Sequence, residues 1–190
     1  VSAISSKGNT VDLNFLDTSE ITNMSYLFDY LNFDGDISKW DVSRVTNMNC
    51  MFKGCAFNGD ISGWNVSQLE STREMFYCSG FNGDISRWNT SKVRDMYSMF
   101  CGSMFNGNIG NWNTSNVVTM ENMFCGSDFN QDIGRWDIRR VQNFEDMFKR
   151  SQYSYNLGNW VKQNQNIRPS IGLPAEQLEY IITDRWMEYE

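Results

Sequence analysis

The stretch FNGDISGWNV, residues 57–66, decides the fold because the chain writes it again at a constant interval. FNGDISRWNT begins at Phe81, FNGNIGNWNT at Phe105 and FNQDIGRWDI at Phe129, each 24 residues after the one before. A fixed period of this length is typical of repeat proteins, in which a unit buries its apolar face only by stacking on a neighbour. The sequence therefore predicts a solenoid with one coil per 24 residues.

Large apolar side chains recur in register with this period. Tryptophan, phenylalanine and isoleucine each occupy fixed positions in successive units, and no insertion or deletion breaks the count. The tryptophan column is Trp40, Trp64, Trp88, Trp112, Trp136 and Trp160. Two phenylalanine columns begin at Phe28 and Phe33, and the isoleucine column begins at Ile37. We expect these columns to form one continuous core.

Each unit combines two patterns that predict two kinds of secondary structure. DISKWDV, residues 36–42, has the apolar spacing of the strand in a leucine-rich repeat. VTNMNCMFKGC, residues 45–55, places its apolar residues at helical spacing. The predicted fold is therefore α/β, a right-handed leucine-rich-repeat-like solenoid of strand-plus-short-helix coils with a C-terminal helical cap. An all-β solenoid is the alternative.

The repeat divides the chain into two predicted parts. Residues 1–160 form the solenoid of about six to seven repeats. Residues 161–190 carry no repeat and hold both prolines, Pro169 and Pro174. A helix after Pro174 would cover the open end of the last coil. A role for this helix in binding a partner is the alternative.

Composition excludes several function classes. The net charge of −7 argues against a nucleic-acid partner, and no apolar run is long enough to cross a membrane. The chain has no histidine, which removes the usual general base and the usual metal ligand. We expect no enzymatic activity and no cofactor, and a monomer or a weak oligomer. Catalysis by paired carboxylates and binding of ice or mineral by threonine rows are the weaker alternatives.

The motif ITNMSYLF, VTNMNCMF and FNQDIGRW resembles the repeats of bacterial BspA-like leucine-rich-repeat surface proteins, mycoplasma lipoproteins and some bacterial effectors. The resemblance covers roughly residues 9–160. It implies a non-catalytic protein-binding module, displayed on the bacterial surface or secreted. The alternative is an effector or phage-encoded inhibitor that binds a protein target in the host or bacterial cytoplasm. The family has no shared catalytic residues to transfer.

A column of aspartates could bind a metal ion, or it could only stabilise the backbone of the turns. Its members are Asp36, Asp60, Asp84 and Asp132. Each coil offers one carboxylate, whereas calcium takes six to eight oxygens. The neighbouring asparagines are Asn58, Asn82, Asn106 and Asn130. We expect them to form a ladder whose side chains bond to turn backbone, and we expect no metal site.

Five cysteines leave at least one unpaired in a monomer. Cys101 and Cys125 share a position in consecutive units and could form a disulfide. The other three do not align, and buried cysteine behaves as a small apolar residue. Reduced thiols in the core are the preferred interpretation, which favours a reducing compartment, and the Cys101–Cys125 bridge stays open.

The residues on either side of each tryptophan vary while the apolar columns stay fixed. We expect the indoles to point inward and their neighbours to form the outward face of the strands. A variable face on a rigid solenoid is the surface such proteins use to bind partners, although it could also be solvated surface alone. The predicted partner-binding residues are Lys39, Asp41, Asn65, Arg87, Asn89, Asn111, Asn113, Arg135, Asp137 and Arg139.

Overall fold

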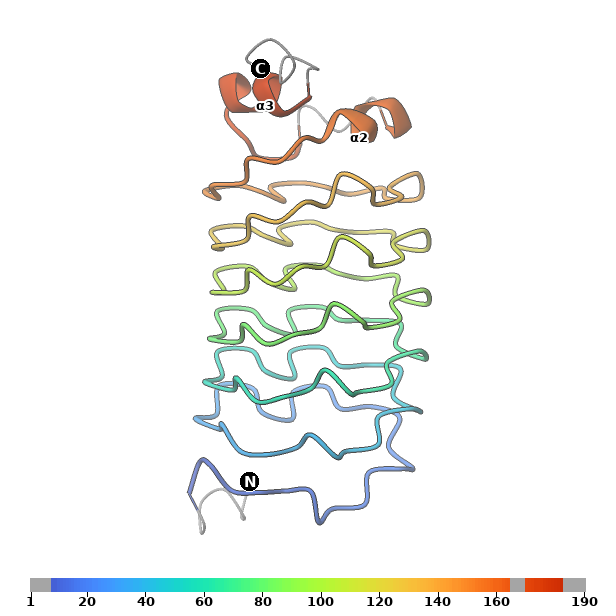
Figure 1. Ribbon diagram of the computed structural model, residues 1–190, viewed down its shortest axis with the longest axis vertical. Coiled ribbons are helices and arrows are strands. Elements are labelled where there is room, and N and C mark those ends of the chain that lie inside the picture. The colour runs from blue at the N-terminus through green and yellow to red at the C-terminus, as the bar shows by residue number, and fades with distance from the viewer. Residues whose placement is uncertain (1–7, 165–169, 183–190) are drawn as a thin grey trace.

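The chain winds into coils that stack along one axis, with the two ends of the chain at opposite ends of the stack (Figure 1). This computed structural model describes residues 8–164 and 170–182. Isolated parallel bridges join consecutive coils at one position, which runs through Asn23, Asn47, Ser71, Asp95, Thr119 and Asn143. Because these residues are 24 apart, each coil has the length of the sequence repeat.

The predicted apolar columns form the core. Their side chains are buried, and the phenylalanines of the central coils have no exposed surface. Rings of one column lie nearly parallel in neighbouring coils: the Phe52 and Phe76 centroids are 5.6 Å apart, and those of Trp88 and Trp112 are 6.5 Å apart. Each coil therefore supplies a layer of rings that its neighbours cover on both sides.

The tryptophans also fix the register of the stack. The Trp112 indole N–H donates to the Ile85 carbonyl of the preceding coil at 3.0 Å, and the Trp136 indole donates to Ile109 at 3.1 Å. All six tryptophans of the column make this bond, at 3.0–3.2 Å. A slip between coils would leave a buried N–H and a buried carbonyl without partners, which is costly.

The predicted α/β architecture is wrong. In the described ranges, helices occur only near the C-terminal end, and coils are joined by isolated bridges and not by strands of a sheet. The chain is therefore not a right-handed leucine-rich-repeat-like solenoid of strand-plus-short-helix coils with a C-terminal helical cap. The bulk of each coil consists of successive turns joined by short extended pieces.

The segment predicted as a helix, residues 45–55, is a run of turns for a backbone reason. Cys50 has φ of 55° and Gly54 has φ of 57°, and left-handed residues interrupt a right-handed helix. The Cys50 N–H donates to the Arg73 carbonyl of the next coil at 2.8 Å. Alternate N–H groups of the segment are used in this way, so they are not free for the i to i−4 bonds of a helix.

The segment predicted as a strand, residues 36–42, is broken by turns. The Trp40 N–H donates to the Ile37 carbonyl at 3.1 Å, and the Val45 N–H donates to the Val42 carbonyl at 3.0 Å. A strand would direct such groups to a neighbouring strand. Here the coils are joined by the indole bonds and by single bonds such as that from the Lys39 N–H to the Asn14 side-chain oxygen at 2.8 Å.

The C-terminal end departs from the repeat. Helix α2 (Gly158–Gln163) begins within the last coil, and helix α3 (Ala175–Ile182) lies further along the chain. The ladder continues through backbone: the Asp146 and Phe148 N–H groups donate to the Ser170 and Ile171 carbonyls, at 2.7 and 2.9 Å. Backbone before α3, and not a helix, thus takes the position of the next coil on this side.

Both helices contribute to the end of the core, and Trp160 of α2 is fully buried in it. Leu178 of α3 is buried against it, and the Gln177 amide donates to the Tyr153 carbonyl at 2.6 Å. In the described ranges, neither helix has the length and apolar character needed to span a bilayer. Residues 165–169 and 183–190 of the predicted capping segment lie outside the described part of the chain, and the division at residue 160 stays a prediction.

Candidate functional site

Two polar hollows meet on one side of the stack. One, of about 350 Å³, is lined by Ser115, Asn116, Asp137, Arg139 and Arg140. The other, of about 270 Å³, is lined by Glu70, Lys92, Arg94 and Asn116. Because Asn116 lines both, we treat these eight residues as one surface and call it the basic groove. It carries four cationic side chains against two carboxylates, in a protein whose net charge is −7.

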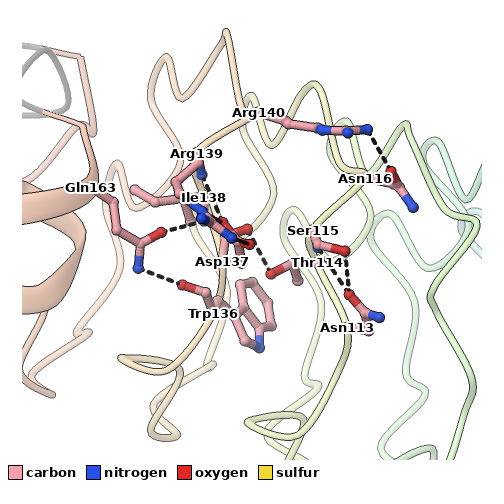
Figure 2. A network of polar contacts seen from close by, with 10 residues as sticks. All are labelled: Asn113, Thr114, Ser115, Asn116, Trp136, Asp137, Ile138, Arg139, Arg140 and Gln163. Atoms are coloured by element: carbon pink, nitrogen blue, oxygen red, sulfur yellow. Dashed lines mark hydrogen bonds and ion pairs between the residues drawn. The ribbon is translucent and has the colours of Figure 1, made fainter.

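One end of the groove is held by an ion pair within a turn. Asp137 accepts bonds from the Arg139 backbone N–H at 3.1 Å and from its Nε at 2.9 Å (Figure 2). The guanidinium of Arg139, which lies over the carboxylate, lowers the pKa of Asp137 to about 2. The Arg139 side chain is 74% exposed, so solvent and ligands reach it from the outer side.

Further cations lie along a column that follows each tryptophan by four residues. Arg140 donates to the Asn116 side-chain oxygen of the preceding coil at 2.7 Å, and Lys92 donates to Gln68 at 2.5 Å. These bonds aim each cation along the stack axis. No described residue forms a hydrogen bond or an ion pair with the exposed guanidinium of Arg94.

Backbone beneath the groove is fixed by side chains from both directions. The Thr114 hydroxyl donates to the Asp137 carbonyl at 3.0 Å. Gln163 of α2 accepts from the Ile138 N–H at 2.8 Å and donates to the Trp136 carbonyl at 3.1 Å (Figure 2). The segment that carries Arg139 is therefore held by the coil before it and by α2, which presents a preorganised cationic surface.

A third hollow lies elsewhere on the surface. It has a volume of about 150 Å³ and is lined by Asn108, Gly110, Asn111, Asp132 and Arg135. Two predicted binding residues, Asn111 and Arg135, thus come together there, beside a carboxylate of the aspartate column.

The ten predicted binding residues are exposed, except for Asp137, which is half-buried. Asp137 and Arg139 line the basic groove. The other six do not line a hollow that the structure describes: Lys39, Asp41, Asn65, Arg87, Asn89 and Asn113. Five of the ten also hold the backbone, since their side-chain oxygens accept the N–H two residues later. These are Asp41, Asn65, Asn89, Asn113 and Asp137. That these ten residues bind a partner stays a prediction.

The predicted binding residues do not include Lys92, Arg94 and Arg140, the cations that dominate the groove. The prediction covered residues from one before to three after a tryptophan, whereas Lys92 and Arg140 follow a tryptophan by four residues and Arg94 by six. The column four residues after the tryptophan holds polar or charged side chains: Arg44, Gln68, Lys92, Asn116 and Arg140. Its polarity beside invariant apolar columns was the available signal.

The side chains of the aspartate and asparagine columns accept hydrogen bonds from backbone N–H groups. Asp60 accepts the Ser62 N–H at 2.9 Å, and Asp84 accepts the Ser86 N–H at the same distance. The Asn82 N–H donates to the Asn58 side-chain oxygen of the preceding coil at 2.8 Å, which confirms the predicted ladder. In the described part of the chain, no group of three or more His, Cys, Asp or Glu side chains is placed to hold a metal ion.

The five thiols are free. Cys50 and Cys55 are buried, as expected of core thiols, whereas Cys78 is exposed and Cys101 and Cys125 are half-buried. Burial, with Cys125 close by, raises the pKa of the Cys101 thiol to about 12. The structure thus contains no Cys101–Cys125 bridge.

An in-register stack of 24-residue coils with a preorganised polar groove defines a repeat protein with one continuous core. The family model described as "Mycoplasma protein of unknown function, DUF285" matches residues 2–104 and 78–171. The chain belongs to this family. A search of curated proteins and a search of solved structures each found no match. The resemblance to BspA-like leucine-rich-repeat proteins stays a prediction.

Proposed function

We propose that this chain is a non-catalytic protein-recognition module. The observation that carries the proposal is the basic groove, a preorganised patch of exposed cations on a surface whose side chains vary from coil to coil over an invariant core. Solenoids bind partners through surfaces of this kind. Arginine is enriched among the residues that dominate binding energy, and Arg139 and Arg140 lie together here.

The chemistry of the surface favours binding over catalysis. The chain has no histidine, so a nucleophile would lack its usual base. The aspartates of the repeat columns are engaged in turns, and their carboxylates accept backbone N–H groups. A paired-carboxylate mechanism needs one acid with a raised pKa, whereas the pKa values of Asp36, Asp60 and Asp84 are lowered by these bonds.

Display on a bacterial surface, or secretion, is the cellular setting we propose for this recognition. The resemblance to surface proteins and the Mycoplasma family support it. Labelling of intact cells with an antibody against the chain tests it, because a surface protein is labelled before lysis. Labelling only after lysis would favour the alternative, an effector or inhibitor that acts in a cytoplasm.

Recognition is tested by capture with a matched pair of variants. Arg135→Glu with Arg139→Glu reverses two cations of the predicted face, and Lys149→Glu with Arg150→Glu makes the same charge change away from it. We expect a partner retained by wild type and by the second variant to be lost from the first. A partner retained equally by all three would remove this surface from the function.

A further inference from the structure

We propose that the basic groove binds an extended, carboxylate-rich segment of a protein partner, which lies along the stack across several coils. This inference rests on the proposed function and names the chemistry of the partner. It depends on three properties of the groove: its excess of cations, its shape along the axis and the polar groups between the cations.

The charge of the groove is opposite to that of the molecule. Lys92, Arg94, Arg139 and Arg140 outnumber Glu70 and Asp137 in a chain of net charge −7. Such a local excess attracts an anion at short range, while salt screens the repulsion from the rest of the surface beyond about 8 Å. The guanidinium of Arg94 has no partner among the described residues, so it can bind a ligand carboxylate without losing a bond.

The shape of the groove fits a linear ligand. Its two hollows share Asn116, and their lining residues come from the coils of Glu70, Arg94, Asn116 and Arg140. Coils in hydrogen-bond register lie about 4.8 Å apart, so this surface extends over roughly 14 Å. That length corresponds to about four or five extended residues.

The groups between the cations suit a polypeptide. Ser115 and Asn116 offer a hydroxyl and an amide that can pair with peptide N–H and C=O groups. Among the described residues, the lining contains no aromatic ring on which a sugar or a base could stack. The described residues of both hollows also include no apolar side chain for the anchors of an amphipathic helix. An acidic extended segment fits better than a glycan, an oligonucleotide or a helix.

Asp137 competes with the ligand in this arrangement. Its carboxylate holds Arg139 through the Nε and the terminal nitrogen. A ligand carboxylate that reaches Arg139 must share this guanidinium or displace Asp137. Replacement of Asp137 by asparagine keeps the turn, because asparagine accepts the same backbone bond in the equivalent position of Asn113. The variant should therefore release Arg139 to the ligand.

Binding of a fluorescent peptide made of alternating glutamate and glycine tests the proposal by polarisation. Wild type should bind it, with affinity falling at least ~10-fold between about 50 and 500 mM salt. Arg94→Glu with Arg140→Asn uses residues that the same columns carry at Glu70 and Asn116, so the coils should tolerate it. This variant should bind at least ~10-fold more weakly. Lys149→Glu with Arg150→Gly has the same charge change and should bind as wild type does.

Removal of the competing carboxylate of Asp137 should raise the affinity for the peptide, whereas removal of a negative charge elsewhere should not. Asp137→Asn should tighten binding about threefold, whereas Asp60→Asn, the same charge change in a turn of the aspartate column, should leave it unchanged. Equal effects of the two variants, loss of binding in the Lys149 and Arg150 control, or tighter binding of heparin or oligothymidine would overturn the proposal. So would self-association of the pure protein that the groove variant abolishes. Capture that depends on Arg135 and Arg139 without peptide binding would leave the proposed function standing and reject this inference.

Discussion

Single polar side chains carry much of the order of this molecule at the residue scale. Asparagine and aspartate accept backbone N–H groups either two residues later in the same coil or in the next coil. These bonds satisfy turn backbone that no helix or sheet provides for. The sequence predicted the asparagine ladder because its position recurs without exception in the central units. The outward residues could not be ranked in the same way, since nothing in a single sequence separates a turn-forming Asn113 from a binding residue.

The ladder predicts a small, specific loss of stability for one asparagine. Asn82→Ala removes the oxygen that accepts the Asn106 N–H at 2.9 Å and should lower the free energy of unfolding by about 1 kcal/mol. Asn82→Asp should cost less, because Asp34 accepts the Asn58 N–H at 2.9 Å in the equivalent position. Urea denaturation measures both. Equal losses for the two variants would contradict the role of the oxygen.

The thiols should differ in reactivity. Cys78 is exposed, whereas burial raises the pKa of Cys101 to about 12 and leaves few reactive thiolates at about pH 8. We expect Cys78 to give the fastest phase with Ellman's reagent, and Cys50 and Cys55 to react only on unfolding. Cys78→Ser should remove that phase. Its persistence at full amplitude would assign the fast phase to one of the other four thiols and contradict this prediction.

At the element scale, each coil is built from successive turns, and these turns explain why the helix prediction was wrong. Four-residue turns, like a helix, direct side chains inward at i, i+3, i+4 and i+7, so Met48, Met51, Phe52 and Cys55 fit both. Backbone conformation distinguishes them. Each unit has two left-handed positions: the one that includes Cys50 and Ser98 is never a glycine, and the one that includes Gly54 is held by Cys78 or Arg150 in other units. The glycines alone therefore did not mark a turn in every unit.

Alanine substitutions at two glycines distinguish the cost of a left-handed backbone from the cost of steric crowding. Gly126 has φ of 60°, and no atom lies within 4 Å of the place that an alanine methyl group would take. Gly63 has equal space without a left-handed backbone. Gly126→Ala should lower the free energy of unfolding by about 1–2 kcal/mol, and Gly63→Ala should leave it nearly unchanged or raise it slightly. Thermal and urea unfolding provide the comparison. An equal response at both sites would argue against the left-handed turn.

The aspartate turns predict acid sensitivity. Bonds from the backbone N–H groups of Ser62 and Ser86 lower the pKa values of Asp60 and Asp84 below 3.8. A lowered folded-state pKa adds stability that is complete above the unfolded value and is lost as pH falls through the folded value. The midpoint of thermal unfolding should hold between about pH 7 and 5 and fall below about pH 4.

A double variant isolates this contribution. Asp60→Asn with Asp84→Asn keeps the accepting oxygens, as Asn108 does at 3.1 Å, but cannot be protonated in this range. Its midpoint should decline less steeply with acid than that of wild type. Identical pH profiles would assign the acid sensitivity to other carboxylates.

For the whole molecule, the period of the repeat predicted which residues stack on one another. It did not predict the backbone conformation of the segments between them. Period alone implies that like residues meet like residues in neighbouring coils, and the stacked rings of Phe52 and Phe76 follow from it. Whether the backbone between them is strand, helix or turn is not encoded in the period. The groove was missed for a related reason, since it forms only when Arg94, Asn116 and Arg140 are brought into line by coils of known pitch.

The central claim concerns residues 45–55 and their equivalents in the other units, the segments predicted to be helical. Hydrogen bonds between coils, and not helices within them, order these segments. Scalar couplings across hydrogen bonds in a deuterated sample test it directly, because they identify the carbonyl that each N–H contacts. We predict a coupling from the Phe76 N–H to the Met99 carbonyl of the next coil, whose oxygen lies 2.9 Å from the Phe76 nitrogen. A coupling from Phe76 to the Thr72 carbonyl, four residues earlier as in a helix, would contradict the account.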